Sequence, residues 1–307
     1  MSLHLFANIV TPYAPAANNR GETDGNMTTL QKLIWHGQVH TTVSAESIRF
    51  ALRRLLTDAG LSMNRKWDDG DRTNVWQDAQ FTAWQGKRDK GQLFADDDIL
   101  GFMSADGAKE EGEKGSAKVR RSPLEISRAV SLTPWPGDTC FNAASPGATP
   151  SAQKKGSAPV PYGTEMHATR YQFGLALTPE ELREKENAVH ALKALSALRH
   201  VAGNHGRFLY DFSPESIVVR ITEDPAPRLL YCFDTSDHGK TVDAAELARR
   251  VAAGDIAANE LYIGGPVAQS PSGIALKTAG AHVENGVVRA VETAITILKS
   301  HLASGKP

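Results

Sequence analysis

The sequence has 307 residues and a formal net charge of −1; 41% of the residues are hydrophobic and 22% are charged. These values are ordinary for a globular protein and provide enough chain for one large domain or two small ones. The near-neutral balance gives no global signal for nucleic-acid binding, so any such signal has to be local. Cys140 and Cys232 form no C-x-x-C pair, which argues against a disulfide framework or a thiolate zinc site.

The N-terminal segment "MSLHLFANIVTPYAP" contains an apolar run without a basic start or a long hydrophobic region. It predicts a strand rather than a signal peptide. No apolar run approaches the roughly 20 residues that a membrane helix requires. A cytoplasmic location without membrane contact is therefore expected, and the sequon at Asn26 is interpreted as a chance match.

The first predicted elements are a strand at residues 3–10 and a helix within "HTTVSAESIRFALRRLL", residues 40–56. Ser44 is expected to cap this helix, whose leucines and isoleucine form one apolar arc that faces the core. From residue 60 to about 161 the chain becomes polar and loses long apolar periods. Within this span, residues 107–122 and 145–163 predict two long, exposed loops.

Between and after these loops, "PLEISRAVSLTPW" and "EMHATRYQFGLALT" predict two strands joined by an elongated excursion over residues 135–163. Loops of that length are uncommon in compact domains and are often functional, although a merely disordered insertion is the open alternative.

The last third of the chain predicts alternating helices and strands. Helices are expected within residues 178–202, 242–254 and 287–302, and strands at 216–221, 228–234 and 260–265. Together with the first strand and helix, this pattern predicts an α+β, ferredoxin-like sandwich with a large insertion.

Catalytic and metal-binding motifs are largely absent. The sequence lacks a phosphate-binding glycine loop and a nucleophile elbow. His36 and His40 are four residues apart, but chance spacing is favoured over a metal site because no third ligand is evident. The carboxylates of residues 96–98 could hold a hard cation, yet a solvated turn or helix cap is the preferred interpretation. We therefore expect no metal, no cofactor and no enzymatic activity.

The helix within residues 40–56 combines two features that favour an anion. Arg49 and Arg53 lie four residues apart along one edge of the apolar arc. Ser44 and Ser47 stand at the helix start, where free N–H groups and the helix dipole attract phosphate. An ordinary solvated arginine face is the open alternative, since arginine is a good helix former. Arg54 points elsewhere and is interpreted as plain surface.

The preceding loop strengthens the phosphate hypothesis, because Asn19 and Arg20 could add amide and guanidinium contacts. The segment "NNRGETDGN" followed by "HTTVSAESIRFALRRLL" resembles the N-terminal signature of the CRISPR-associated DevR autoregulator family. That pattern is an Asn-Arg loop, then Val-Ser-x-x-Ser-hydrophobic-basic and a further arginine, supplied here by Asn19, Arg20, Val43, Ser44, Ser47, Ile48, Arg49 and Arg53. The segments "ADDDILGFM" and "GRFLYDFSPESIVVRITEDPAPRLLY" are also similar to this family.

The resemblance implies a guide-RNA-binding backbone subunit of a type I Cascade complex, with subtype I-B favoured. Such subunits have an RRM-like palm, a helical finger insertion and a long β-hairpin thumb. On this basis residues 1–60 and 165–307 would form the palm, residues 61–123 the finger and residues 134–163 the thumb. Copies of the subunit stack head to tail into a helical filament along the crRNA.

Each thumb then displaces one nucleotide, and the rest of the guide pairs with target DNA in antiviral defence. The implied partners are crRNA, target DNA through the guide, further copies of the chain, a large subunit, a subunit that caps the guide 5′ end and a guide-processing endonuclease. Because such a guide is gripped without regard to its sequence, phosphate contacts should dominate while base pairing supplies specificity.

The resemblance also implies site residues. Those expected to grip the guide backbone are Asn19, Arg20, Ser44, Ser47, Arg49 and Arg53. Lys154 and Lys155 could contact nucleic acid from the thumb loop, with a solvated loop as the alternative. Trp135, at the border of that loop, could wedge against a base or pack on a neighbouring subunit. Met166 begins the returning strand, and its role is open.

Two alternative functions are kept. Related type III subunits cleave RNA with an aspartate in the N-terminal loop, where this chain has Glu22 and Asp24. These two residues are interpreted as ordinary loop carboxylates; the alternative is a metal-dependent nuclease that uses them or residues 96–98. The other alternative is a DNA-binding transcriptional autoregulator. The absence of an evident helix-turn-helix argues against it. The aromatic run of an ordinary RRM is missing, so base stacking on an open sheet face is not expected.

Overall fold

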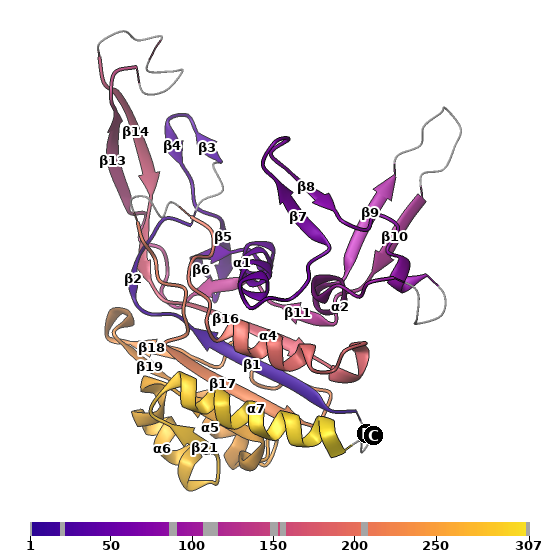
Figure 1. The fold of residues 1–307 in the computed structure, drawn as a ribbon. Coiled ribbons are helices and arrows are strands. Elements are labelled where there is room, and N and C mark those ends of the chain that lie inside the picture. The colour runs from indigo at the N-terminus through magenta and orange to yellow at the C-terminus, as the bar shows by residue number, and fades with distance from the viewer. Residues whose placement is uncertain are drawn as a thin grey trace.

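The computed structural model describes residues 2–18, 22–85, 91–106, 116–147, 153, 158–203 and 208–304. Among these residues the largest sheet has nine strands in the order β21-β20-β17-β1-β16-β12-β6-β5, and β11 also pairs with β16 (Figure 1). The strands are β1 (His4–Val10), β5 (Lys32–Trp35), β6 (Gln38–Val43), β11 (Leu124–Ile126), β12 (Ala129–Ser131), β16 (Tyr171–Leu177), β17 (Ser216–Thr222), β20 (Leu261–Gly264) and β21 (His282–Glu284).

The centre of the sheet has the connectivity of a split β-α-β unit. In chain order β1, α1, β12, β16, α4 and β17 follow one another, while the lateral order is β17-β1-β16-β12. The pairs β1–β16, β1–β17 and β12–β16 are all antiparallel. This order is that of the ferredoxin-like motif. The predicted mixture of helices and strands around one sheet is therefore confirmed.

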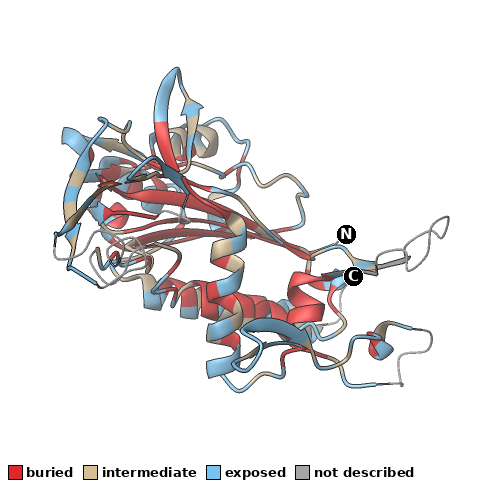
Figure 2. Ribbon diagram, turned by 90° about the horizontal axis from the view of Figure 1, so that it is seen from above, coloured by how far each residue is buried: buried red, intermediate tan, exposed pale blue. Residues whose placement is uncertain are grey.

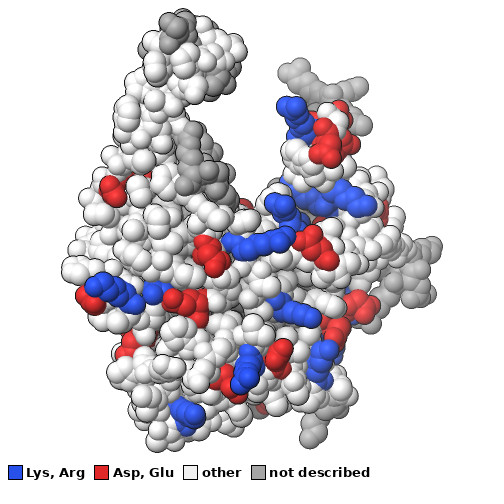
Figure 3. Space-filling view, turned by 60° about the vertical axis from the view of Figure 1, so that its left-hand side comes forward, with Lys and Arg blue, Asp and Glu red and all other residues white. Residues whose placement is uncertain are grey.

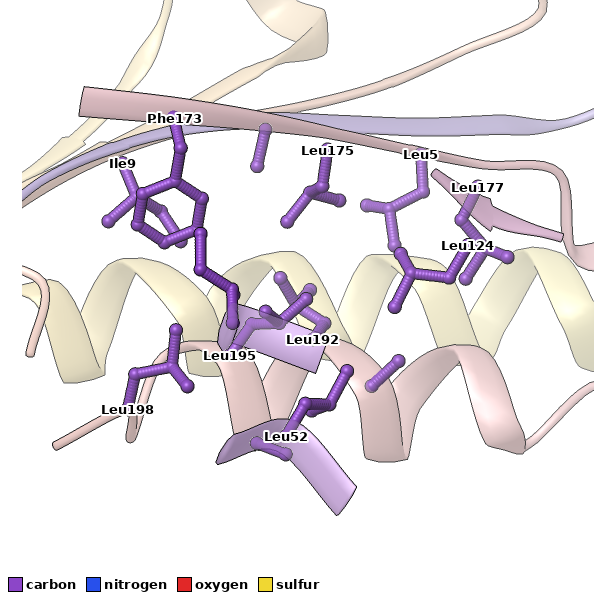
Figure 4. Packing of buried hydrophobic residues seen from close by; sticks show 14 of the residues in the cluster. Leu5, Ile9, Leu52, Leu124, Phe173, Leu175, Leu177, Leu192, Leu195 and Leu198 are labelled. Carbon is purple, nitrogen blue, oxygen red and sulfur yellow. The ribbon is translucent and has the colours of Figure 1, made fainter. Parts of the chain in front are cut away.

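Helices cover both faces of this sheet. The α-helices of the described residues are α1 (Ala45–Asp58), α2 (Ala95–Leu100), α4 (Asn187–Leu195), α5 (Ala245–Ala252), α6 (Pro271–Thr278) and α7 (Val287–Ser304). Helices α1, α4 and α7 pack on one face, where Leu52 and Leu192 meet Phe173 and Leu175 of β16 (Figure 4). Helices α5 and α6 contribute Leu247 and Leu276 to a second cluster, on the other face. Because both faces are buried, β1 is apolar along most of its length rather than alternating.

The predicted strand at residues 228–234 is wrong. Only its last residue belongs to a strand, β18 (Asp234–Ser236), which pairs with β19 (Thr241–Asp243). The preceding residues cross the second face of the sheet, where Tyr231 N donates to Asn8 Oδ1 (3.1 Å) and Phe233 N to Gln172 Oε1 (3.2 Å). Polar side chains of β1 and β16 thus satisfy this backbone in place of a strand partner. The crossing segment covers the sheet face that an ordinary RRM leaves open.

Two sets of hairpins project from the sheet (Figure 1). On one side β13 (Thr139–Ala144) and β14 (Val160–Glu165) form a hairpin, which β4 (Met27–Thr28) and β3 (Thr23–Asp24) extend to four strands. On the other side lie the hairpins β7–β8 and β9–β10, whose strands are β7 (Arg65–Asp68), β8 (Thr73–Trp76), β9 (Phe102–Asp106) and β10 (Ser116–Arg120). Figure 2 shows buried residues concentrated in the central layers, whereas the projections are mostly exposed or intermediate.

Residues 61–123 were expected to form a helical insertion, and this expectation is wrong for the described part. Two β-hairpins dominate it, with the short helix α2 and the 3-10 turn η1 (Thr82–Trp84) between them. The remaining short elements of the described residues are β2 (Ala14–Ala16), β15 (His167–Thr169), η2 (Pro179–Glu181), η3 (Asp237–Gly239), η4 (Ala258–Glu260) and η5 (Pro266–Gln269). No helix in the described ranges is long and apolar enough to span a membrane.

The three aspartates of α2 correct another prediction, since all three side chains are buried rather than solvated. Asp96 accepts hydrogen bonds from the backbone N–H groups of Asn64 (2.7 Å) and Arg65 (3.0 Å). Asp98 accepts from Arg183 N (2.9 Å), Glu184 N (3.1 Å) and Asn187 Nδ2 (2.9 Å). The Asp98 bonds join the hairpin insertion to the segment that leads into α4, which begins at Asn187, later than the sequence predicts.

The carboxylates of α2 are therefore structural, and no group of His, Cys, Asp or Glu among the described residues is arranged to hold a metal. Asp97 differs from the other two aspartates of α2 in its hydrogen bonds, and its pKa is raised. Burial and, secondarily, the neighbouring Asp96 raise the pKa of the Asp97 carboxyl to about 7. Its Oδ2 accepts from Asn64 Nδ2 (2.9 Å), while its Oδ1 has no hydrogen-bond partner among the described residues.

This raised pKa makes stability depend on pH. The unfolded chain releases the Asp97 proton near pH 4, whereas the folded protein holds it to about pH 7. Between these values the folded state binds more protons, so the free energy of unfolding falls as pH rises, and it levels off above pH 7. We expect Asp97→Asn to be about 1–3 kcal/mol more stable than the unsubstituted protein at pH 8, with the gain lost at pH 4. Urea denaturation at both pH values measures this; an equal difference at both would contradict it.

Candidate nucleic-acid interface

The molecule is hollowed between its two projections, and Lys and Arg side chains line the floor and one wall of the hollow (Figure 3). A groove of about 1220 Å³ lies between α1 and the hairpins β7–β8 and β9–β10. It combines basic and aromatic side chains: the described residues that line it include Arg49, Arg53, Arg54, Arg65, Arg120, Phe50, Trp67, Trp76 and Phe102. Such a combination can bind phosphates and planar bases together.

The start of α1 was predicted from Ser44, and the structure confirms this cap. Ser44 has an extended backbone, and its hydroxyl accepts from Ser47 N at 3.3 Å. The two hydroxyl oxygens also lie 3.1 Å apart, within hydrogen-bond distance. Ser44 is buried and Ser47 is half-buried. Both hydroxyls therefore serve the helix cap, and Ser47 is the member that a ligand can reach.

A carboxylate already occupies the helix start. Glu46 is exposed in the first turn, and a hydrogen bond from its own backbone N–H lowers the pKa of its carboxyl. The Ser44 hydroxyl and the charge of Arg128 act in the same direction. The Glu46 carboxylate therefore already provides part of the negative charge that the dipole of α1 attracts to its N-terminus.

Arg49 and Arg53 line the groove and also attach α1 to α2. The Arg49 guanidinium donates to the backbone oxygen of Leu100, and Arg53 Nε lies 3.8 Å from Asp96 Oδ2. Both side chains are half-buried, and burial lowers the pKa of each guanidinium. Residues 47 and 49 are separated by about 160° around the helix. The structure therefore divides the predicted cluster into a serine pair at the helix start and an arginine pair in the groove.

Arg54 was interpreted as plain surface, yet it lines the same groove. Its side chain is exposed. Arg65 and Arg120 of the hairpins also line the groove. They were not predicted because the polar sequence of residues 61–123 has no periodic pattern. Arg120 is largely structural, since its guanidinium lies 4.0 Å from the Trp84 ring centroid and 3.3 Å from Asp98 Oδ1.

A further missed cation lies beside the helix start. Arg128, exposed between β11 and β12, donates to Thr42 Oγ1 (3.2 Å) and Gln31 Oε1 (3.0 Å). It is 86 residues from Thr42 in the chain, so only the pairing of β12 with β6 brings it there. No local signal in the sequence could have identified it.

Trp135 and Met166 are brought together at the base of the β13–β14 hairpin. Trp135 Nε1 donates to the backbone oxygen of Met166 at 2.9 Å. Lys32 Nζ lies 4.1 Å from the Trp135 ring centroid and 2.5 Å from Glu165 Oε2. The indole is thereby fixed in orientation and half-buried. Met166 contributes through its backbone, which the sequence alone could not indicate.

The remaining predicted contacts, Asn19, Arg20, Lys154 and Lys155, lie outside the described residues. Asn18, directly before the first pair, is buried, and its Nδ2 has no hydrogen-bond partner within the described part of the chain.

The carboxylates of the nuclease alternative are not equivalent. Glu22 and Asp24 are exposed at β3, whereas the aspartates of α2 are buried and engaged with neighbouring backbone or amide N–H groups. Among the described residues, every carboxylate oxygen of α2 except Asp97 Oδ1 therefore accepts a structural hydrogen bond.

Fold and site together define a mixed α/β protein with projecting hairpins around a basic, aromatic hollow. The chain belongs to the family described as "CRISPR-associated negative auto-regulator DevR/Csa2", whose model matches residues 9–253. It is 62% identical over 295 residues to the "CRISPR-associated protein Cas7/Cst2/DevR" of Myxococcus xanthus (strain DK1622), covering 96% of this chain and 97% of that protein. The family resemblance predicted from the N-terminal motifs is confirmed.

Two solved structures share the fold. A chain of a "CRISPR RNA-guided surveillance complex, pre-nicking" superposes with a TM-score of 0.62 at 11% identity, covering 96% of this chain and all of that one. A chain of a "CRISPR RNA-guided surveillance complex" gives 0.58 at 12% identity, covering 96% and 99%. At these identities the likeness shows the fold alone.

Proposed function

We propose that this protein is a non-catalytic, crRNA-binding backbone subunit of a type I CRISPR surveillance complex, with subtype I-B favoured. Copies of it polymerise along the guide RNA and present it for pairing with target DNA in antiviral defence. The observation that carries the proposal is the convergence of arginines from α1 and two hairpins on one aromatic groove, in a chain of the DevR/Csa2 family. Guanidinium groups bind phosphates of any sequence, as a guide-binding subunit requires.

The domain roles follow from the same proposal. Residues 1–60 and 165–307 form the palm, residues 61–123 the finger and residues 134–163 the thumb. The split β-α-β sheet supports the palm assignment, and the antiparallel hairpin β13–β14 supports the thumb assignment. Further copies of the chain, a large subunit, a guide 5′-end-capping subunit and a guide-processing endonuclease are the proposed partners, in the cytoplasm.

Guide contacts are assigned to three places. At the start of α1 they are made by Ser47, beside the buried cap residue Ser44, and by the loop residues Asn19 and Arg20. In the groove they are made by the arginine pair, Arg49 and Arg53, to which we add Arg54, since it lines the groove and is exposed. In the thumb, Trp135 acts as the wedge at a displaced nucleotide, held by Met166, and Lys154 and Lys155 contact the backbone.

The function is tested by co-expressing the protein with its neighbouring subunits, purifying the assembly and sequencing any bound RNA. We expect RNAs of uniform length whose internal sequences differ, because phosphate contacts do not select sequence. Absence of RNA, or one single RNA sequence, would contradict the proposal. Tight binding of the isolated protein to a specific DNA duplex, uncompeted by RNA, would instead favour the autoregulator alternative.

The non-catalytic part of the proposal has its own test. The assembled complex is incubated with complementary target RNA and magnesium, and we expect no cleavage. Cleavage that disappears in Asp24→Ala would identify this exposed carboxylate as catalytic and would overturn the assignment.

Replacing Glu46 is expected to strengthen RNA binding, whereas most substitutions at the interface are expected to weaken it. Because its carboxylate lies at the helix start where a phosphate is proposed to bind, Glu46→Gln should strengthen RNA binding about 2- to 5-fold at low salt. The gain should fade above about 0.3 M salt, where exposed charges are screened. Fluorescence anisotropy with a labelled RNA at several salt concentrations measures it; weaker binding at low salt would contradict the placement of phosphate at this helix start.

A further inference from the structure

The groove also exposes apolar side chains, which phosphate binding does not explain. Its wall and floor expose large apolar side chains: the exposed fractions are 56% for Trp67, 69% for Met103 and 64% for Val119 on the hairpins, and 54% for Phe50 on α1. A contiguous apolar surface of this kind on a soluble domain marks a site of interaction. Since the same groove carries arginines, its occupant has both apolar faces and negative charge.

Trp67 is held in position before any ligand arrives. It lies on β7, and its Nε1 donates to Asp69 Oδ1 at 3.0 Å, which orients the indole. Trp76, on the paired strand β8, instead packs against Phe81 with ring centroids 5.0 Å apart. Trp76 therefore supports the hairpin, while the ring of Trp67 stays available for stacking.

The charges of the groove select the kind of partner. Its described lining has five arginines but only two carboxylates, Glu46 and Asp58, and Asp58 is paired with Arg199 at 3.0 Å. The volume of about 1220 Å³ exceeds the roughly 300–1,000 Å³ of a small-molecule pocket. A polyanion with planar apolar groups fits both properties, and single-stranded nucleic acid is such a ligand.

We propose that the groove binds a single-stranded RNA segment, with bases stacked on Trp67 and Phe50 and phosphates directed to the arginines of α1. This inference rests on the proposed function and deepens it, because it adds a base-stacking wall on the β7–β8 hairpin to the phosphate contacts. Stacking is tolerant of sequence, since every base has a π-face.

The test compares the full-length protein with Trp67→Ala, using a short labelled RNA and the same RNA with abasic sites. Loss of one stacked base predicts binding about 5- to 100-fold weaker, with an unchanged slope of log K against log salt. Trp67→Phe should restore binding to within about 3-fold, since it keeps a stacking ring. Ile274→Ala, at an exposed position on α6, is the control and should change nothing. On the abasic RNA the penalty of Trp67→Ala should vanish.

The outcomes separate the two proposals. If Trp67→Ala binds like the unsubstituted protein while Arg49→Ala with Arg53→Ala weakens binding, the stacking inference is overturned and the phosphate proposal stands. If none of these substitutions changes binding, RNA does not occupy the groove, and both proposals are overturned. A Trp67→Ala penalty that persists on abasic RNA also overturns the stacking inference, since no base is then needed for the effect.

Discussion

The Arg49→Ala/Arg53→Ala double variant is expected to bind guide RNA about 10- to 100-fold more weakly at 0.1 M salt, equally for all sequences. Both guanidinium groups line the groove at one edge of α1, and each lost phosphate contact lowers the salt dependence for single strands by about 0.7. The slope of log K against log salt should therefore fall by about 1.4. Fluorescence anisotropy titrations at four salt concentrations provide both quantities.

The same residues also fasten α1 to α2, so the measurement needs a structural control. Arg49→Lys/Arg53→Lys keeps both charges while removing the guanidinium geometry that contacts Leu100 and Asp96. It should retain the slope and lose less than about 5-fold in affinity. If the alanine variant keeps the free energy of unfolding of the unsubstituted protein and also binds RNA with unchanged affinity and slope, the arginine assignment is refuted.

Asp98→Ala is expected to lower the free energy of unfolding by about 3–5 kcal/mol. The buried carboxylate accepts from two backbone N–H groups and the Asn187 amide, and lies 3.3 Å from Arg120. Removing it leaves two backbone N–H groups and the Asn187 amide without this acceptor, and it also removes the negative charge beside Arg120. Urea denaturation followed by tryptophan fluorescence measures the loss.

The control for this variant is Asp58→Ala, whose exposed ion pair with Arg199 should contribute less than about 1 kcal/mol. If Asp98→Ala were no more destabilising than Asp58→Ala, Asp98 would not anchor the hairpin insertion to α4.

Local signals predicted much of this fold. Ser44 caps α1 because a serine with extended backbone satisfies the free N–H of Ser47, and this pattern lies within four residues. The strands β1 and β17 and the helix α7 were likewise predicted from short apolar periods. The segment 228–234 was misassigned because its apolar residues are buried by crossing the sheet, with Asn8 and Gln172 as distant partners.

The candidate site was only partly predictable. The family motif identified Arg49 and Arg53. Arg54 and Arg65 become candidates only in the folded protein, where the hairpins and α1 form one groove. The burial of the α2 aspartates depends on N–H groups that are 31 to 89 residues away in the chain. Local sequence patterns cannot identify such distant partners, so this anchoring cluster was predicted to be a solvated turn or helix cap.

Ultraviolet cross-linking of the native assembly, followed by mass spectrometry of peptide–RNA adducts, would identify the residues of this protein that contact the guide RNA. We expect adducts on α1 and the β7–β8 hairpin, which line the groove, and at Trp135, the proposed wedge residue. Adducts confined to α5, α6 and α7, with none on α1 or the hairpins, would contradict the claim that this protein holds its guide RNA in the groove.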